Sequence, residues 1–169
     1  MASLKNGVTF VIDHHASPFA IGGSLDIIAT AFEKVGASHL LCYEISDRDG
    51  TQKAQEGLME TAEYLEENQG LVGLHASFTV SDDTLQKAVR VAKHFDTGIH
   101  IHVAEAQSDQ DHCVEKYGKR VIERLQKAGA LSSPKTILGH CLHLSEKEKE
   151  VIAASPVWVV QNTESNLNN

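Results

Sequence analysis

Short apolar segments alternate along the chain with longer segments in which apolar residues recur at helical spacing. This alternation is typical of repeated βα units that build a parallel sheet. Strands that are covered on both faces are nearly continuously apolar, and the short segments have that character. The pattern predicts six strands, at residues 8–13, 39–44, 71–75, 99–104, 136–141 and 157–161.

Helix boundary signals stand between these strands. Ser24 can cap a helix that stops at Gly36, and Ser145 with Glu148 forms a capping box that opens a helix before Pro156. Apolar residues three and four positions apart mark the other helical stretches. The expected helices cover residues 24–36, 54–67, 82–94, 111–128 and 145–155.

No linker or low-complexity tract divides the 169 residues, so we expect one domain over residues 1–169. A closed barrel of eight βα units takes about 250 residues. Six units would suit either an open doubly wound sheet or an incomplete barrel. The last predicted strand runs into NTESNLNN with no helix to cover it, which favours an α/β fold of the partial (β/α)8 barrel type.

Charge and hydropathy exclude several classes of partner. Asp and Glu number 23 against 15 Lys and Arg, a net charge of −8, and no basic run offers a site for a phosphate backbone. Apolar runs fall far short of the roughly 20 residues that span a bilayer, and MASLKNG lacks a signal peptide's apolar stretch. Three cysteines are an odd number for a disulfide framework. We therefore expect a cytoplasmic protein that binds neither nucleic acid nor membrane.

The predicted carboxyl ends of the strands are unusually polar. Ligands bind at these ends in barrels and in open α/β sheets. The chain contains ten histidines, and several of them stand there. The polar residues at these positions are Asp13, His14, His15, Glu44, Arg48, His75, His100, His102, Glu105, His140, His143, Asn162, Ser165 and Asn166.

The fourth predicted strand carries two histidines on one face. Residues two apart on a strand point the same way, so His100 and His102 can hold a metal ion together. Glu105 follows three residues later and could handle a proton of metal-activated water. The alternative is a pair of ordinary core or surface histidines. His75 and His140 favour the metal site, because they end neighbouring strands at the same rim.

Four strings, in order, carry a resemblance to a known family: GLHASFTVSDD, IHIHVAEAQSD, ILGHCLHLSEKE and VVQNTESNLNN. They resemble the amidohydrolase superfamily, and within it the cytosine/guanine deaminase and chlorohydrolase branch, including aminohydrolases linked with selenium metabolism. The resemblance implies a (β/α)8 barrel with one divalent metal ion, zinc in preference to iron. It also implies hydrolysis of a C–N bond in a small-molecule substrate, most simply the deamination of an aminated heterocycle.

The resemblance also implies roles for individual residues. His102 would be the metal ligand, Glu105 the proton shuttle, and His140 the group beside the metal that polarises the atom under attack. His100 would then be a supporting residue. The substrate would be contacted by His75, Asn162, Ser165 and Asn166.

Two departures from the family pattern qualify these roles. The family takes two metal ligands from an HxH motif on its first strand and an Asp from its eighth. No HxH motif precedes GVTFVID here, and the predicted strands stop before an eighth. The six predicted strands would therefore be the family's second to seventh. The chain is expected to be an internal fragment of such an enzyme or, alternatively, a catalytically inactive truncated barrel that acts only as a self-associating scaffold.

Several residues leave a choice between chemistry and packing. His14 and His15 could replace the missing ligands, although loop residues that bind water or a helix end are commoner. Arg48 could clamp an anionic substrate or lie in a solvated charged loop. Cys141 is expected to be a buried thiol and Trp158 a core side chain. Because an unclosed barrel exposes strand edges, we also expect a homo-oligomer.

Overall fold

The computed structural model describes residues 2–167 and contains six strands among them. All strand pairs are parallel, as the alternating pattern predicted. The strands are β1 (Phe10–His15), β2 (Ser38–Tyr43), β3 (Val72–Ala76), β4 (Ile99–Val103), β5 (Ile137–His140) and β6 (Trp158–Val160). The helices are α1 (Ala2–Lys5), α2 (Ser24–Val35), α3 (Thr51–Glu67), η1 (Ser77–Thr79), α4 (Asp82–His94), α5 (Gln107–Tyr117), α6 (Val121–Ala128), α7 (Glu146–Ala153) and α8 (Thr163–Asn166).

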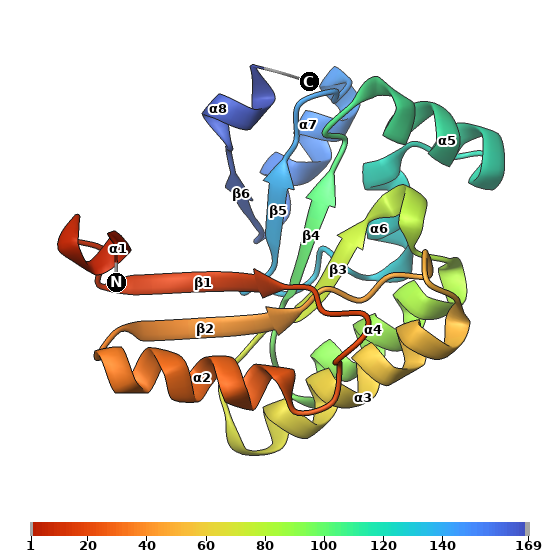
Figure 1. Cartoon of the computed structure of the whole chain (residues 1–169). Helices are drawn as coiled ribbons and strands as arrows, with labels where there is room; N and C mark the ends of the chain where they lie inside the picture. Colours follow the sequence, from red (N-terminus) through yellow and green to blue (C-terminus); the bar gives the residue numbers. More distant parts are fainter. Residues whose placement is uncertain (1, 168–169) are drawn as a thin grey trace.

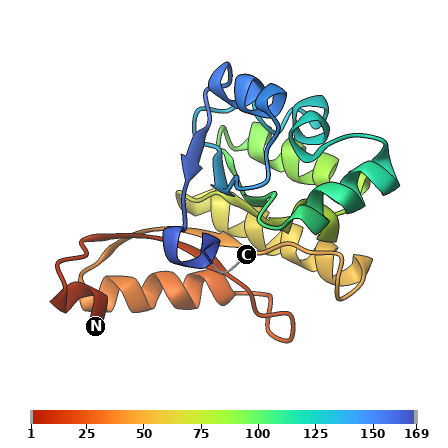
Figure 2. The same ribbon diagram turned by 90° about the horizontal axis from the view of Figure 1, so that it is seen from above.

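The strands form two parallel sheets that meet between β2 and β3. One sheet pairs β1 with β2, and the other has the order β3-β4-β5-β6. Isolated bridges from Leu41 to Gly70 and from Ile45 to Leu74 continue the contact across the junction. The first sheet runs across the direction of the second, so the carboxyl end of β1 points toward β4 (Figure 1). Seen from above, β1, β2 and α2 extend as a layer from one side of the remaining unit (Figure 2).

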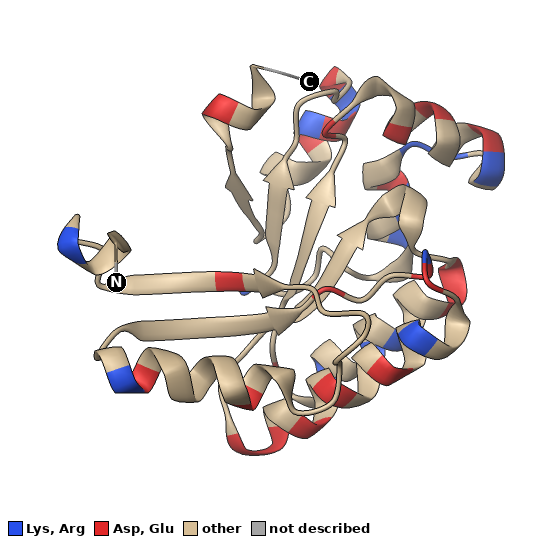
Figure 3. Cartoon of the chain, viewed as in Figure 1, with Lys and Arg blue, Asp and Glu red and all other residues tan. Residues whose placement is uncertain are grey.

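A single large core joins the strands to the helices. Leu41, Leu74, Ile101 and Leu138 come from four successive strands and are all less than 2% exposed. They pack with helix residues at the spacing that the sequence predicted, including Leu85 on α4. Lys, Arg, Asp and Glu lie mainly on the helices and loops, with the two signs mixed (Figure 3). Within residues 2–167, no helix has the length and apolar character needed to cross a membrane.

The single helix expected over residues 111–128 is wrong, because the chain forms α5 and α6 there. Gly118 ends α5 in the left-handed region, with a φ of 64°, and α6 starts after Arg120. Within α5, the apolar residue that faces the core is Cys113, which is fully buried. Its apolar neighbour Val114 is 47% exposed.

The chain's last elements also differ from expectation. Trp158 is 66% exposed instead of buried, because β6 is an edge strand with all three residues exposed. Its indole nitrogen donates a hydrogen bond to the Pro134 carbonyl at 2.9 Å. The segment after β6 is not without a helix, since the short α8 follows it. At the other end, β1 runs to His15, so His14 and His15 belong to a strand and not to a loop.

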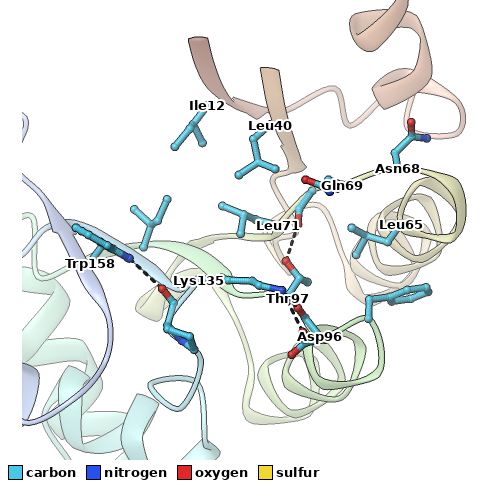
Figure 4. Close-up of a pocket in the computed structure, with 14 residues that line it drawn as sticks. Ile12, Leu40, Leu65, Asn68, Gln69, Leu71, Asp96, Thr97, Lys135 and Trp158 are labelled. Atoms are coloured by element: carbon cyan, nitrogen blue, oxygen red, sulfur yellow. Dashed lines mark hydrogen bonds and ion pairs between the residues drawn. The ribbon is translucent and has the colours of Figure 1, made fainter. Parts of the chain in front are cut away.

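A large cavity lies at the amino ends of the strands and has a volume of about 730 Å³. Ile12, Leu40, Leu71 and Trp158 give it mainly apolar walls (Figure 4). Its polar rim includes an ion pair between Lys135 and Asp96 and lies at the end of the sheet opposite the predicted chemistry. The polar residues predicted for the functional site lie at the carboxyl ends, away from this cavity.

Candidate functional site

His102 stands at the centre of a group of histidines from four strands. Its ring centroid lies 5.0 Å from that of His14 on β1, 5.7 Å from that of His75 on β3 and 5.4 Å from that of His140 on β5. Parallel strands bring their carboxyl ends to one edge, and these side chains follow from that geometry. The sequence correctly placed His75, His102 and His140 on one rim.

His100 and His102 share a face of β4, as strand alternation predicted. Both are partly buried, while the residues between and beside them are fully buried. They face a cavity of about 290 Å³ that Ile12, Gly139 and Asn162 help to line. This cavity is smaller than the one at the amino ends, but it is the one that adjoins the histidines.

Among residues 2–167, three sets of side chains bring metal-binding atoms within 4.8 Å of one another. His102 belongs to all three sets. The sets are His14 with His100 and His102, Glu44 with His75 and His102, and His102 with Glu105 and His140. The third set contains the residues to which the family resemblance assigns metal binding and proton transfer.

The predicted rim residues of α8 close around His140 and Glu105. His140 Nε2 lies 3.5 Å from a Glu105 oxygen, and Ser165 Oγ donates to the other Glu105 oxygen at 3.5 Å. The Asn166 side-chain oxygen accepts from His140 Nδ1 at 2.7 Å, and the Asn162 amide donates to Nε2 at 3.3 Å. These partners favour the tautomer that carries its proton on Nδ1, in which Nε2 accepts from the Asn162 amide.

The backbone at this edge is strained. Ala104, His140 and Cys141 adopt φ values of 46°, 65° and 55°, in a region that residues other than glycine rarely enter. Neighbouring hydrogen bonds hold them there, including Cys141 N–H to the Val103 carbonyl at 2.9 Å. The Asp109 carboxylate also accepts from Ala104 N–H at 2.8 Å. Such strain tends to cluster at functional sites, and here it fixes the directions of Glu105 and His140.

Burial keeps the central imidazoles neutral. Desolvation, followed by electrostatic interaction with the neighbouring histidines, lowers the pKa of His100 to about 3 and that of His102 to about 4. Burial also lowers the pKa of His75. Neutral imidazole is the form that binds a metal ion, so these rings are ready to act as ligands at neutral pH.

Glu44 connects the histidines to Arg48 and was not among the residues to which the sequence assigned a role. One of its oxygens lies 3.3 Å from His14 Nε2, and the other accepts a hydrogen bond from Arg48 at 2.7 Å. Burial acts to raise the pKa of Glu44, but the interactions with His14, His75 and Arg48 outweigh it and lower the pKa overall. Arg48 is thus engaged by a carboxylate of this chain.

His14 is the second site residue whose role the sequence analysis did not predict. Its ring contacts His100, with 4.6 Å between centroids, and its side chain is only 12% exposed. A strand extended by two residues, VTFVIDHH, would have placed it at the rim. His15 points elsewhere, and its Nε2 pairs with Ser17 at 2.9 Å.

Known proteins resemble this chain over nearly its whole length. A 5'-deoxyadenosine deaminase from Methanopyrus kandleri is 30% identical over 174 aligned positions, which cover 99% of this chain and 38% of the relative. A 5-methylthioadenosine/S-adenosylhomocysteine deaminase from Thermoanaerobacter pseudethanolicus is 31% identical over 150 positions, which cover 84% of this chain and 35% of the relative. The chain therefore spans little more than a third of the length of these relatives.

Solved structures share the fold. An adenosine deaminase from Xanthomonas campestris with bound zinc matches with a TM-score of 0.82 at 24% identity, over 97% of this chain and 37% of that one. A guanine deaminase from C. acetobutylicum with bound guanine matches with a TM-score of 0.81 at 16% identity, over 98% and 42%. These likenesses confirm the predicted α/β fold of the partial barrel type. Since the model of the amidohydrolase family matches residues 1–169, the sequence resemblance is confirmed and the chain belongs to the amidohydrolase family.

Proposed function

We propose that this chain carries the metal-binding and proton-transfer residues of an amidohydrolase that deaminates an aminated heterocycle. Water adds to the ring carbon that bears the amino group, the C–N bond breaks, ammonia leaves and a ring carbonyl remains. The convergence of His102, Glu105 and His140 within 4.8 Å is the observation that supports this function best. The relatives named as deaminases of adenosine derivatives support a purine-type substrate.

The donor set fits a divalent metal ion. Imidazole nitrogens with a nearby carboxylate suit zinc, and they suit iron as well. We propose zinc, held by His102 with His140 beside it. The ion would supply Lewis-acid chemistry, which makes water a competent nucleophile at neutral pH.

Glu105 is the proposed proton carrier. Its carboxylate reaches toward His140 Nε2 at 3.5 Å, on the side where the histidines gather. In this role it takes a proton from the attacking water and delivers it to the departing amine. Ser165 Oγ, at 3.5 Å, helps to orient the carboxylate.

His140 is proposed to polarise the carbon under attack, and α8 to hold it in place. Asn166 fixes the Nδ1 side of the ring, so the Nε2 side faces the substrate. His75, whose Nδ1 pairs with Thr79 Oγ1 at 2.8 Å, lies on the adjacent strand. We propose that His75, Asn162, Ser165 and Asn166 also border the bound heterocycle.

The test is Glu105→Gln in the full-length protein, with 5'-deoxyadenosine as the probe and ammonia release as the measurement. The amide keeps the shape of the side chain but cannot accept the proton, so turnover should fall by roughly 10²–10⁴. Metal content should not change. Glu115→Gln on the exposed side of α5 is the matched control and should keep full turnover. Near-normal turnover of Glu105→Gln would remove this residue from the mechanism.

The second candidate, a scaffold without catalysis, rests on the exposed edges of the two sheets. Phe10 on β1 is 53% exposed and Trp158 on β6 is 66% exposed. Large apolar side chains on unpaired strands favour self-association. A chain that associates but binds no metal ion would favour the scaffold over the enzyme.

A further inference from the structure

We propose that His14 and His100, together with His102, form a second kind of metal site in this chain, one that takes a transition-metal ion such as zinc and does not use Glu105 or His140. This site shares only His102 with the proposed catalytic group. It does not depend on the deaminase activity.

The three histidines come from strands that are not neighbours in either sheet. His14 lies near the end of β1, while His100 and His102 lie on β4. The first sheet crosses the second, and this crossing brings the carboxyl end of β1 to the inner face of β4 (Figure 1). The contact is a consequence of tertiary packing, because 86 positions separate His14 from His100 in the chain.

The nitrogen atoms of this group already converge. His14 Nδ1 lies 2.5 Å from His100 Nδ1, closer than the usual 2.7–3.2 Å of a nitrogen hydrogen bond. One ring nitrogen from each of the three histidines lies within 4.8 Å of the others. Zinc–nitrogen bonds of about 2.0–2.1 Å in a tetrahedral site require nitrogens roughly 3.3 Å apart. Changes of up to about 1.5 Å in the distances between these nitrogens would therefore seat the ion.

Glu44 gives the site the outer contact that metal-bound histidines normally have. If His14 Nδ1 binds the metal ion, the ring proton must sit on Nε2. His14 Nε2 is buried and forms no hydrogen bond of good geometry within residues 2–167, yet a Glu44 oxygen lies 3.3 Å from it. A carboxylate that accepts the second ring N–H orients a ligating histidine, so Glu44 is the positioning residue of this site. Arg48 holds the other Glu44 oxygen at 2.7 Å and thereby fixes the carboxylate.

The surroundings also leave room for an ion with a water molecule. His100 and His102 border the cavity of about 290 Å³ on the inner face of β4. The cavity exceeds the share of about 30 Å³ that one water occupies in the liquid. Three imidazoles favour zinc, copper or nickel over magnesium or calcium, which prefer oxygen ligands.

The test is zinc affinity of the metal-stripped 169-residue chain, measured by competition with a chromophoric chelator. Because both groups need His102, the parent sequence should bind about one zinc ion per chain, and we expect it at His14, His100 and His102. His14→Gln and His100→Gln should each weaken binding on the order of 100-fold, a larger loss than His140→Gln causes. His94→Gln, an exposed histidine on α4, is the matched control. Far-ultraviolet circular dichroism checks that each variant is folded.

A measurement on the unchanged chain guards against variants that fail to fold. Zinc addition should move the ring nitrogen resonances of His14, His100 and His102 in a nitrogen-15 spectrum, and leave those of His140 in place. Loss of zinc on His140→Gln, with His14→Gln and His100→Gln unaffected, would overturn the second site and agree with the proposed catalytic group. A chain that binds no zinc would also overturn it, and the Glu105→Gln experiment would still judge the deaminase separately.

Discussion

The two ends of the strands gather opposite kinds of side chain. At the carboxyl ends of β3, β4 and β5, His75, His102 and His140 surround one point, with 5.4–5.7 Å between His102 and the other two ring centroids. At the amino ends, Leu71 and Trp158 help to line an apolar cavity of about 730 Å³. The same sheet thus presents a polar rim at one end and an apolar base at the other.

The backbone differs between the two ends as well. The rim holds Ala104 and His140 at positive φ, a strained conformation that positions Glu105 and the His140 ring. At the base, the backbone is closely packed around Gly98, since a Cβ there would lie 2.2 Å from the Lys135 carbonyl. The comparison teaches that one sheet can combine a strained, polar rim with an apolar base, where a cavity lies beside closely packed backbone.

The largest expected effect is on the base. Gly98→Ala should destabilise the fold by about 3 kcal/mol or more, because the Lys135 backbone cannot move away from the new methyl group. Urea unfolding measures the change. Gly22→Ala is the matched control, because nothing lies within 4 Å of the position its Cβ would occupy. Equal stability of the two variants would show that the strand base is not closely packed.

The next largest expected effect is on self-association, which the exposed edge strand β6 should favour. We expect the chain to form a dimer or larger oligomer through β1 and β6, and Trp158→Lys should raise the dissociation constant at least tenfold. Sedimentation equilibrium measures this constant. Phe19→Lys is the control, because Phe19 is 97% exposed but lies in the loop after β1. A monodisperse monomer at every concentration would contradict the prediction.

The smallest effect is the pH dependence of the rim. The pKa of His100 is about 3 in the folded chain and 6.5 as the ordinary value, so below pH 6.5 the unfolded chain binds the extra proton. This contribution to stability is complete above pH 6.5 and is lost as the pH falls toward 3. At pH 5.5 the loss should be about 1.4 kcal/mol.

The measurement compares urea unfolding of the parent chain and His100→Gln at pH 7.5 and pH 5.5, with chelator present. The parent should lose more stability than the variant between the two pH values. An identical pH dependence would mean that His100 is not held neutral by burial. His39→Gln is the control, because His39 lies on strand β2 and is not one of the histidines gathered around His102.

Local patterns predicted most of the elements. The continuous apolar runs located all six strands, and the capping box at Ser145 opens α7, where the Glu148 N–H donates to Ser145 Oγ at 3.3 Å. The apolar periodicity gave a wrong prediction over residues 111–128, where two neighbouring helices both bury apolar residues in the same core. α5 and α6 bury faces against the same core, so their apolar positions resemble a single helix until Gly118 is recognised as a helix end.

The candidate site also contains residues that local sequence patterns identify and residues that they do not. Glu105, His140 and His102 could be found because short motifs fix them at strand ends. His14 and Glu44 could not, because their importance depends on β1 crossing toward β4. Trp158 was misjudged for a related reason, since an apolar strand sequence does not say whether another strand covers it.

The sequence by itself determined the parallel α/β architecture, the family and the polar rim. Periodicity, caps and strand-end motifs are local, so they can be identified in the sequence before the packing is known. Only the tertiary structure decided that His14 meets His100 and that Glu44 stands behind His14. It also decided that β6 is an exposed edge. Contacts between residues far apart in the chain depend on how the two sheets cross, and no local pattern records that angle.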